Sequence, residues 1–522
     1  MRPRRAATAV ALLGGASAVA WWRWRSAHSA PSTIPRWRRA HSAPSTIPRW
    51  RRRSDAAPGS PINTTSRTGR NIGLARLGAR AGIGEVAHRA RRAVTPADQR
   101  EGLDQAHAMR TAEQVASTLG NMRGALMKLG QMASYLDEGL PEHLRVALSQ
   151  LQQAAPPMSA DLAAGVIRAE LGADPSEVFA EWDPLPIAAA SIGQVHRARL
   201  RDGRAVAVKV QYPGVDEAIR ADLGTASVLF KGMSALYPGL DPGPLVAELQ
   251  ERLLEELDYR IEADNQELFA AWFAGHPFIS VPAVIREHST GRVLTSEFVV
   301  GSRFDDVLTW SQEQRDLAGE AIFRFVFRGI YRLHAFNGDP HPGNYLFHGD
   351  GRVTFLDFGL VKRFDPAETE MFGAMIRANV AGDAAAFRGA VERAGLLPPG
   401  QPFADEDIVG YFSAFYHLVA ESKTMRVEGS YASELVRRTF DASGPYGPIM
   451  KVANVPKPFV IIQRINLGLI AVLAQLGATA NWRLIAEELW PWVSGAPSTP
   501  MGELEAAWLA EHHPDVSAGL LA

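Results

Sequence analysis

Two aspartates and an asparagine within a short stretch of the chain constrain its fold more than any other feature. They lie in Asp339-Pro-His-Pro-Gly-Asn344 and in Asp357-Phe-Gly359. Transfer of a phosphoryl group from a nucleotide requires a carboxylate beside the acceptor hydroxyl and oxygen ligands that hold Mg²⁺ against the phosphates. Asp339 can supply the first, and Asn344 and Asp357 can supply the second. The spacing therefore predicts a phosphoryl-transfer site.

Apolar runs on both sides of a glycine-rich turn predict how the second aspartate is presented. Residues 345–347 precede the turn Gly349-Asp-Gly351, and residues 353–356 follow it. They predict two short strands of a hairpin, the second of which directs Asp357 to the metal. Protein kinases have the same order, a D-x-x-x-x-N catalytic loop followed by D-F-G. Turn-forming residues alone would explain the loop, but not the motifs elsewhere in the chain.

A glycine-poor loop and a lysine-bearing strand lie upstream of this site. The segment Ala188-Ala-Ala-Ser-Ile-Gly-Gln-Val195 leads into an alternating strand that ends at Leu200. An Asp202-Gly203 turn connects that strand to Ala205-Val-Ala-Val-Lys209-Val. In kinases a strand–loop–strand hairpin of this kind covers the nucleotide phosphates and ends in the V-A-I-K lysine. We therefore predict that Lys209 binds the phosphates.

The loop departs from the kinase pattern G-x-G-x-x-G-x-V at two positions. Gly193 and Val195 match the third glycine and the valine, whereas Ala188 and Ala190 replace the first two glycines. Each alanine removes access to positive φ, so we expect the loop to lie differently over the phosphates. The residues predicted to contact the nucleotide here are Ala188, Ala190, Ser191, Gly193, Val195 and Lys209.

A long acidic segment, residues 243–273, contains candidates for the carboxylate that pairs with a phosphate-binding lysine. It is predicted to be helical and includes Glu255-Glu-Leu-Asp-Tyr-Arg-Ile-Glu262. Asp258 and Glu262 are four residues apart, which predicts that they share one face of that helix. Residues 293–301 resemble the last strand of a kinase N-lobe and its hinge, where backbone groups near Glu297 to Val299 would meet adenine.

The rest of the chain is predicted to be mostly helical. A long apolar helix over residues 316–336 leads to the catalytic loop, and helices continue through residues 365–522. Residues 101–155 also have helical periodicity and contain Lys128-Leu-Gly-Gln131. The apolar run from Phe459 to Ala478 is interrupted by polar side chains, so we predict a buried helix rather than a membrane span.

Composition excludes several classes of protein. The 522-residue chain is 46% hydrophobic and 21% charged, which excludes global disorder. It has no cysteine, so disulfides, thiolate metal sites and a cysteine nucleophile are excluded. The absence of cysteine also fits a reducing compartment.

The beginning of the chain differs from the rest in charge. Residues 1–54 hold twelve arginines and no acidic residue. The uncharged run from Ala6 to Trp22 would span roughly 25 Å as a helix, slightly less than the roughly 30 Å core of a bilayer. If it inserts, the arginines that follow it place the bulk of the protein in the cytoplasm. The alternative is a signal peptide cleaved after Ala16-Ser-Ala18, and an ATP-dependent site downstream argues against export.

An identical tandem repeat of proline-rich sequence follows, in residues 27–39 and 40–52. Packed repeat architectures need longer units and several of them, so we predict a disordered basic arm. Its arginines and tryptophans favour an anionic membrane surface. A dispensable tail is the alternative.

The combination of motifs resembles the AarF/UbiB family of atypical kinases, also called the ADCK family in eukaryotes. The motifs are Lys128-Leu-Gly-Gln131, Ala188-Ala-Ala-Ser191, Glu256-Leu-Asp258 with Glu262, Asp339-Pro-His-Pro-Gly-Asn344 and Asp357-Phe-Gly359. The resemblance covers residues 65–490 and implies an α+β, two-lobed protein-kinase-like fold with an N-terminal helical extension and a mostly helical C-lobe. The predicted parts are a basic arm over residues 1–60, the extension over 61–158, the N-lobe over 159–300 and the C-lobe over 301–522.

The resemblance also implies roles for the residues of the site. Lys209 contacts the phosphates and pairs with Glu262. Asn344 and Asp357 hold Mg²⁺, and Asp339 takes the catalytic position.

A second set of residues is implied to regulate access. The extension carries Lys128, Gly130 and Gln131 across the active site, where a protein substrate would otherwise dock. These residues would face Glu256 and Asp258. The chain also departs from the family, because many members have a histidine two residues before the catalytic aspartate. This chain has Asn337 there, and His334 lies further back.

The resemblance implies ATP or ADP and Mg²⁺ as cofactors, and an ATPase or lipid-responsive regulator rather than a protein kinase. It implies support of isoprenoid quinone biosynthesis, with a membrane lipid, a quinone precursor and quinone-biosynthesis proteins as partners and no nucleic acid. The expected location is the cytoplasm, at a membrane surface or anchored by residues 6–22.

Two other classes of function stay open. Small-molecule kinases of the aminoglycoside-phosphotransferase type also use a G-D-x-H-x-G-N loop, which residues 338–344 match, but they lack the K-x-G-Q helix and the alanine-rich loop. A non-catalytic scaffold that binds nucleotide or lipid is the other class. The chain retains all of the expected metal and phosphate ligands, which argues against complete loss of nucleotide binding.

Overall fold

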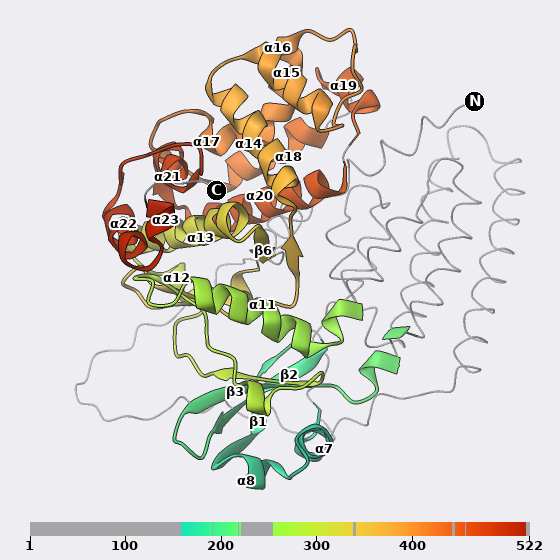
Figure 1. Cartoon of the computed structure of the whole chain (residues 1–522), viewed down its shortest axis with the longest axis vertical. Coiled ribbons are helices and arrows are strands. Elements are labelled where there is room, and N and C mark those ends of the chain that lie inside the picture. Colours follow the sequence, from blue (N-terminus) through green and yellow to red (C-terminus); the bar gives the residue numbers. More distant parts are fainter. Residues whose placement is uncertain are drawn as a thin grey trace, which may run out of the picture.

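The computed structural model describes residues 158–190, 192–217, 219–220, 254–337, 341–440, 444–454 and 456–517. They form a smaller lobe built on an antiparallel sheet and a larger lobe built mostly of helices, each with its own hydrophobic core (Figure 1). This is the α+β, two-lobed architecture predicted from the sequence. The predicted arm and nearly all of the predicted helical extension lie outside the described residues.

The sheet of the smaller lobe has the strand order β1-β2-β3-β5, and every neighbouring pair is antiparallel. Its strands are β1 (Glu181–Ala189), β2 (Gly193–Arg199), β3 (Ala205–Gln211) and β5 (Val293–Glu297). Side chains alternate between the two faces of a strand. In β3, Val206, Val208 and Val210 therefore enter the core of the lobe, and Lys209 lies on the opposite face. The predicted hairpin of β2 and β3 is confirmed.

Two helices precede the sheet, α7 (Ala160–Leu171) and α8 (Pro175–Val178). Ser159 caps α7 by accepting a hydrogen bond from the Leu162 amide at 3.4 Å, and Gly172 ends the helix with φ 79°. Both are favoured residues at these positions, because serine can accept from the free amides and glycine tolerates positive φ.

The strand β1, which precedes the alanine-rich loop, was not predicted from the sequence. Pro184 and Pro186 conceal it, because proline cannot donate to a strand ladder and is confined to edges and irregular positions. β1 is the edge strand of the sheet, and its register with β2 shifts on both sides of Pro186. The hairpin that encloses the loop is therefore β1–β2, and the Asp202-Gly203 turn lies at the other end of β2.

Helix α11 (Tyr259–Trp272) crosses the molecule between the sheet and the helical lobe (Figure 1). The prediction of one continuous helix through Glu262 is wrong, because the chain leaves the helical conformation at Asp258, where φ is −116° and ψ is 98°. Asp258 is the N-cap of α11, and its side chain accepts from the Arg260 amide at 3.1 Å. Asp258 and Glu262 therefore do not share a helix face. The predicted segment from 243 to 253 lies outside the described residues.

The larger lobe is organised around α13 (Gln312–Arg332), most of which is buried from Ala318 onward. Ser311 and Gln314 form a capping box at its start, in which each side chain bonds the other residue's backbone amide. The helix begins and ends four residues earlier than predicted. The last residues of the predicted helix instead form a strand that leads into the catalytic loop.

Short strands frame the catalytic loop. They are β4 (Ile279–Ser280), β6 (Ala335–Asn337), β7 (Tyr345–Phe347), β8 (Val353–Phe355) and β9 (Val361–Arg363). β7 pairs antiparallel with β8, β8 pairs with β4, and β6 pairs with β9. Gly349 and Gly351 have φ of 79° and 90° in the β7–β8 turn, values that suit glycine. The predicted hairpin before Asp357 is confirmed.

Further helices complete the larger lobe: α12 (Phe304–Val307), α14 (Pro366–Val380), α15 (Ala384–Arg393), α16 (Asp405–Phe412), α17 (His417–Ala420), α18 (Gly429–Phe440), α19 (Gly447–Val452), α20 (Lys457–Leu476), α21 (Trp482–Leu489), α22 (Pro500–His512) and α23 (Pro514–Ser517). α20 is the predicted buried helix, and its Leu467, Ile470 and Leu473 lie in the core. Within the described ranges, no helix has the length and apolar character to cross a bilayer.

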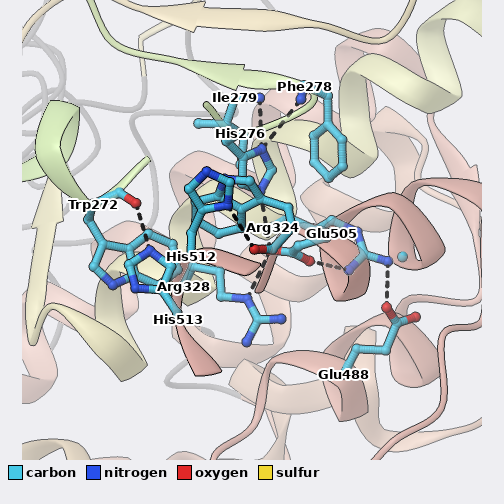
Figure 2. A network of polar contacts seen from close by, with 12 residues as sticks. Trp272, His276, Phe278, Ile279, Arg324, Arg328, Glu488, Glu505, His512 and His513 are labelled. Carbon is cyan, nitrogen blue, oxygen red and sulfur yellow. Dashed lines mark hydrogen bonds and ion pairs between the residues drawn. The ribbon is translucent and has the colours of Figure 1, made fainter. Parts of the chain in front are cut away.

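Helices α21 and α22 dock onto α13 through a group of five charged side chains, here termed the buried ionic cluster (Figure 2). Its members are Glu320, Arg324, Arg328, Glu488 and Glu505, none of which has a side chain more than 8% exposed. Arg324 contacts the three glutamates at 2.7 to 2.9 Å, and Arg328 contacts Glu505 at 2.9 Å. Every glutamate of the cluster is thus bonded to an arginine inside the lobe.

The segment after α11 also meets this cluster (Figure 2). His276 Nδ1 accepts hydrogen bonds from the amides of Phe278 and Ile279 at 3.4 and 3.1 Å, which places the ring proton on Nε2. That Nε2 lies 3.6 Å from Glu505 Oε1. Trp508 Nε1 donates to the Ala274 carbonyl at 3.1 Å. The last helices therefore hold α13 and the end of α11 together.

Candidate functional site

The structure brings Lys209 of β3 and Glu262 of α11 into direct contact. Lys209 Nζ donates to both carboxylate oxygens of Glu262, at 2.7 and 2.8 Å. The side chains are 15% and 4% exposed, so water competes little for this pair. Because Tyr259 follows the N-cap directly, Glu262 falls in the first turn of α11 and points to β3.

Asp357 lies on the other side of the lysine. Its Oδ2 is 3.7 Å from Lys209 Nζ, and its Oδ1 accepts from the Gly359 amide at 3.0 Å. The side chain is 37% exposed, so part of the carboxylate is open to a ligand. The site therefore presents a lysine that is fixed by one carboxylate and faces a second, more accessible one.

The charges of this trio explain its pKa values. Burial alone would lower the pKa of Lys209, but the charges of Asp357 and Glu262 outweigh it and raise that pKa well above its ordinary value. Burial raises the pKa of Glu262 to about 7, while Lys209 opposes the rise and Asp357 adds to it. Burial, together with one cation shared by two carboxylates, accounts for both directions. The excess negative charge is what a divalent cation neutralises.

Asn344 ends the short 3₁₀ helix η4 (Pro342–Asn344) in the catalytic loop. Its carbonyl accepts from the Leu356 amide at 3.0 Å, which fixes the loop beside the residue before Asp357. His341 Nδ1 accepts from the Gly343 amide at 3.0 Å and stiffens the same turn. Asp339, the predicted catalytic residue, lies outside the described residues.

The donors at this position fit Mg²⁺ held together with phosphates. Mg²⁺ is commonly bound by one or two carboxylates, with substrate phosphates and water completing its octahedron. Asn344 and Asp357 offer one amide oxygen and one carboxylate. In the part of the chain that the structure describes, no three His, Cys, Asp or Glu side chains converge as an independent metal centre. The residues fit a metal that arrives with a nucleotide.

The alanine-rich loop forms the tip of the β1–β2 hairpin. Ala188 pairs with Val195, and the Ala190 amide donates to the Gly193 carbonyl at 2.9 Å. His334 is the one non-glycine with positive φ among the described residues, so Ala188 and Ala190 keep ordinary backbone angles. The strand pairing thus continues to the loop, although alanines replace the first two glycines of the kinase pattern. Ser191 lies outside the described residues, and the expected effect on the nucleotide stays a prediction.

Gly193 has a packing role rather than a conformational one. A Cβ at this position would collide with the Val210 carbonyl and lie 2.8 Å from the Tyr259 hydroxyl. Any larger residue would force β2 away from β3 or from α11. Val195 continues β2 opposite Lys209.

Asn337, noted in the sequence only as a departure from the family, contacts the D-F-G segment. Its Nδ2 donates to the backbone carbonyl of Asp357, and the side chain is 6% exposed. His334 adopts φ 46°, and its Nδ1 lies 3.1 Å from Thr369 Oγ1 on α14. Asn337, and not His334, therefore connects the catalytic-loop strand to Asp357.

Asn265 of α11 is a second contact that the sequence did not reveal. Its Nδ2 donates to the Phe358 carbonyl at 3.2 Å, and its Oδ1 accepts from Arg363 at 3.2 Å. These bonds link α11, which carries Glu262, to the segment that carries Asp357. A polar residue in an acidic helix gives no sequence signal for such a role, and only its burial identifies it.

The predicted hinge follows β5. The Glu297 side chain accepts from the Ala283 amide at 3.1 Å, and the Phe298 amide donates to the Ala205 carbonyl at 3.0 Å. Val299 comes next and lies between the two lobes in the chain. The predicted adenine contacts at Glu297 and Val299 stay a prediction.

The predicted regulatory residues are only partly described. Asp258 forms an ion pair with Arg260 at 2.8 Å, and Glu256 lies two residues before it. Gln211 of β3 donates to the Leu257 carbonyl at 3.0 Å, which attaches this segment to the strand of Lys209. Lys128, Gly130 and Gln131 lie outside the described residues, so their approach to Glu256 and Asp258 stays a prediction.

Known proteins are similar to this chain in sequence and in fold. The ABC1 atypical kinase-like domain matches residues 150–390, which include every candidate residue except those of the K-x-G-Q segment. Atypical kinase COQ8B, mitochondrial, of Rattus norvegicus is 34% identical over 322 residues, 61% of this chain and 61% of that protein. Atypical kinase COQ8, mitochondrial, of Saccharomyces cerevisiae is 35% identical over 254 residues, 48% of this chain and 51% of that protein. The matches span about half to three-fifths of these relatives.

A solved structure agrees over a longer stretch. The complex of Rv3197 with erythromycin, from Mycobacterium tuberculosis, is 32% identical with a TM-score of 0.56, and the match covers 74% of this chain and 98% of that one. Domain, relatives and fold all agree with the resemblance that the motifs indicated. The chain belongs to the AarF/UbiB family of atypical kinases.

Proposed function

We propose that this chain is an ATP-dependent phosphotransferase or ATPase that binds ATP or ADP together with Mg²⁺ between its lobes. The observation that carries the proposal is the trio of Lys209, Glu262 and Asp357. Phosphoryl transfer depends mainly on positioning and on compensating the charge of the phosphates. A fixed lysine beside a partly exposed carboxylate provides both a phosphate-binding cation and a metal-binding anion.

Each residue has a role in this proposal. Glu262 keeps the Lys209 ammonium in place, and Lys209 binds the phosphates. Asn344 and Asp357 hold Mg²⁺, which when bound compensates the negative charge of the phosphates. Asp339 accepts the proton of the attacking hydroxyl or water.

The remaining predicted residues complete the binding site. The loop from Ala188 to Val195 covers the phosphates, and the backbone near Glu297 to Val299 meets adenine. Lys128 and Gln131 face Glu256 and Asp258 and exclude protein substrates, which favours an ATPase or a small acceptor.

The family membership supports a function in isoprenoid quinone biosynthesis or homeostasis. We place the protein in the cytoplasm, at a membrane surface or anchored by residues 6–22. A membrane lipid or a quinone precursor is the proposed effector, and quinone-biosynthesis proteins are the proposed partners. Two relatives of this chain are named as mitochondrial atypical kinases, in agreement with a kinase-type activity.

A small-molecule acceptor is the second candidate. Rv3197 was determined in complex with erythromycin, so one relative of known structure binds a hydroxyl-bearing small molecule. Small-molecule kinases share the G-D-x-H-x-G-N loop that residues 338–344 match.

The test measures ATP turnover by the full-length protein with and without Mg²⁺. Anionic vesicles with and without a short-chain quinone are compared, and a panel of hydroxyl acceptors that includes erythromycin is analysed for phosphate transfer. We expect Mg²⁺-dependent turnover that rises with quinone-containing vesicles. Transfer to a panel member instead supports the second candidate. Absence of both nucleotide binding and turnover contradicts the proposal.

A further inference from the structure

Tyr259 is buried beside the proposed nucleotide site with an unused hydroxyl. It is the first residue of α11 and is 1% exposed. Among the residues that the structure describes, its hydroxyl oxygen has no hydrogen-bond partner. Buried polar groups in native proteins almost always have a partner, and an exception requires an explanation. A partner that arrives with a ligand is one such explanation.

The hydroxyl lies at the base of the phosphate loop. A Cβ built on Gly193 would be 2.8 Å from it, so the oxygen sits directly against the residue at which the loop enters β2. The ring of the same tyrosine lies under the lysine, with Lys209 Nζ 5.1 Å from the ring centroid. The phenol thus occupies the space between the loop and the phosphate-binding cation.

The position of the ring is fixed from several directions. The Tyr259 amide donates to the Gly291 carbonyl at 3.0 Å, and Asp258 caps the helix at the preceding residue. Gln211 of β3 binds the Leu257 carbonyl two residues earlier. Because the backbone is held on both sides, the hydroxyl cannot leave the site to find a partner in solvent.

Three of the acceptor oxygens near the site are already engaged. Both oxygens of Glu262 accept from Lys209 Nζ, and one oxygen of Asp357 accepts from the Gly359 amide. A nucleotide phosphate bound at Lys209 would bring new oxygen acceptors next to the phenol. A hydrogen bond to a charged acceptor is stronger than one between neutral groups.

We propose that Tyr259 is a phosphate-binding residue whose hydroxyl donates a hydrogen bond to a phosphate oxygen of the nucleotide, while its ring holds Lys209 beside that oxygen. This inference rests on the proposed nucleotide-binding function. It predicts that the hydroxyl distinguishes a nucleotide from a nucleoside, and that it contributes nothing to the stability of the free protein.

Tyr259→Phe removes only the hydroxyl and keeps the ring over the lysine. Isothermal titration calorimetry with Mg²⁺–ADP and with adenosine separates the phosphate contact from contacts to the nucleoside. We expect the affinity for Mg²⁺–ADP to fall by about three- to tenfold, the effect of one hydrogen bond. The affinity for adenosine stays unchanged. The melting temperature of the free protein stays the same or rises, because an unpaired buried hydroxyl is lost.

Tyr416→Phe is the matched control, because Tyr416 is a buried tyrosine of the helical lobe outside the site. It should change neither affinity. As a second measurement, 3-fluorotyrosine labelling of the wild type should give a ¹⁹F resonance that shifts with Mg²⁺–ADP but not with adenosine, and that is absent from the spectrum of Tyr259→Phe.

The outcomes separate the two proposals. If the wild type binds no Mg²⁺–ADP, the proposed function and this inference both fail. If the wild type binds and Tyr259→Phe binds equally well, only this inference fails. Equal losses for ADP and adenosine, or a lower melting temperature of the free variant with unchanged affinity, assign the hydroxyl a structural role and also overturn it.

Discussion

Two groups of charged side chains, one in the candidate site and one inside the helical lobe, differ in how far they are closed to solvent. The site trio has one cation, Lys209, between two carboxylates, and Asp357 is 37% exposed. The buried ionic cluster surrounds Arg324 and Arg328 with three glutamates, and no side chain exceeds 8% exposure. The site trio is partly open to solvent, and the buried ionic cluster is closed to it.

The carboxylates of the two groups have pKa values shifted in opposite directions. Glu262 in the site has its pKa raised to about 7, because burial outweighs the attraction of Lys209. Burial would also raise the pKa of Glu505, but Arg328, His276 and Arg324 outweigh it and hold that pKa well below its ordinary value. In the cluster, every carboxylate bonds an arginine directly. In the site, Asp357 lies 3.7 Å from Lys209 and stays partly exposed, as expected where a metal and a nucleotide bind.

The largest expected effect comes from a change in the site trio. Asp357→Asn removes a charged metal ligand, so we expect Mg²⁺-dependent nucleotide binding to be abolished while the fold is retained. Nucleotide-induced thermal stabilisation is the measurement. Asp350→Asn is the control, because Asp350 lies in the exposed β7–β8 turn and should change stability by no more than about 0.5 kcal/mol. Wild-type stabilisation of Asp357→Asn by nucleotide would refute its assignment.

The cluster should respond in the opposite way. Glu505→Ala leaves Arg324 and Arg328 short of their shared partner in a closed interior, so we expect a loss of about 3–5 kcal/mol in the free energy of unfolding. Urea denaturation measures it, and Glu511→Ala on the exposed face of the same helix is the control. The nucleotide affinity of the folded fraction should stay unchanged. A loss of less than about 1 kcal/mol would show that the cluster does not stabilise the lobe.

Lys209 and Glu262 should act as one unit in nucleotide binding. Removal of either leaves the other uncompensated, so Lys209→Met and Glu262→Gln together should lose less affinity than the sum of the single changes, with a coupling of about 0.5–3 kcal/mol. Glu267→Gln is the control, because Glu267 pairs with Arg286 instead. Additive losses would mean that a different carboxylate orients the lysine.

A smaller effect is expected at Asn337. Asn337→Ala removes the donor to the Asp357 carbonyl and should weaken Mg²⁺–nucleotide binding by about 1 kcal/mol. Asn337→His, the residue common in the family, should keep a donor and lose less. Calorimetric titration of both variants tests this. Equal affinities for wild type and Asn337→Ala would separate Asn337 from the positioning of Asp357.

The smallest effect is a difference in pH dependence between the two groups. A carboxylate whose pKa is lowered by folding, such as Glu505, contributes stability that is present above pH 4.5 and is lost as the pH falls through its folded-state value. Burial also lowers the pKa of His276, so the unfolded chain takes up a proton first and stability falls below about pH 6.5. The contribution of Glu262 has the opposite pH dependence. Because folding raises its pKa, the free energy of unfolding falls as the pH rises from 4.5 to about 7.

Urea denaturation at several pH values between 4 and 8 measures these contributions. Relative to the wild type, Glu505→Gln should flatten the loss of stability at acidic pH. Glu262→Gln should gain relative stability as the pH rises toward 7. Changes of the same sign in both variants would contradict the contrast between the site and the cluster.

Local sequence patterns predicted much of the site but not its surroundings. The β7–β8 hairpin and β3 were predictable because apolar runs flank glycine turns and alternate in and out of a core. β1 was not, because Pro184 and Pro186 remove the usual strand signal. The break at Asp258 was hidden in an acidic run whose composition suits a continuous helix. The contact of Asn337 with Asp357 required the fold itself.

The buried ionic cluster could not be predicted from the sequence. Arg324 and Glu505 are 181 residues apart, and each reads as an ordinary surface charge on an amphipathic helix. Only the docking of α22 on α13 brings them together. Long-range pairs of this kind leave no periodic signal, whereas the motif residues of the site are fixed within short segments.

The most direct test of the central claim is calorimetric titration of the full-length protein with ADP, in the presence of Mg²⁺ and after chelation with EDTA. If Lys209, Glu262 and Asp357 form a site for a metal-bound nucleotide, affinity should be high with Mg²⁺ and should fall strongly without it. Equal affinity under both conditions, or no binding under either, would contradict the account.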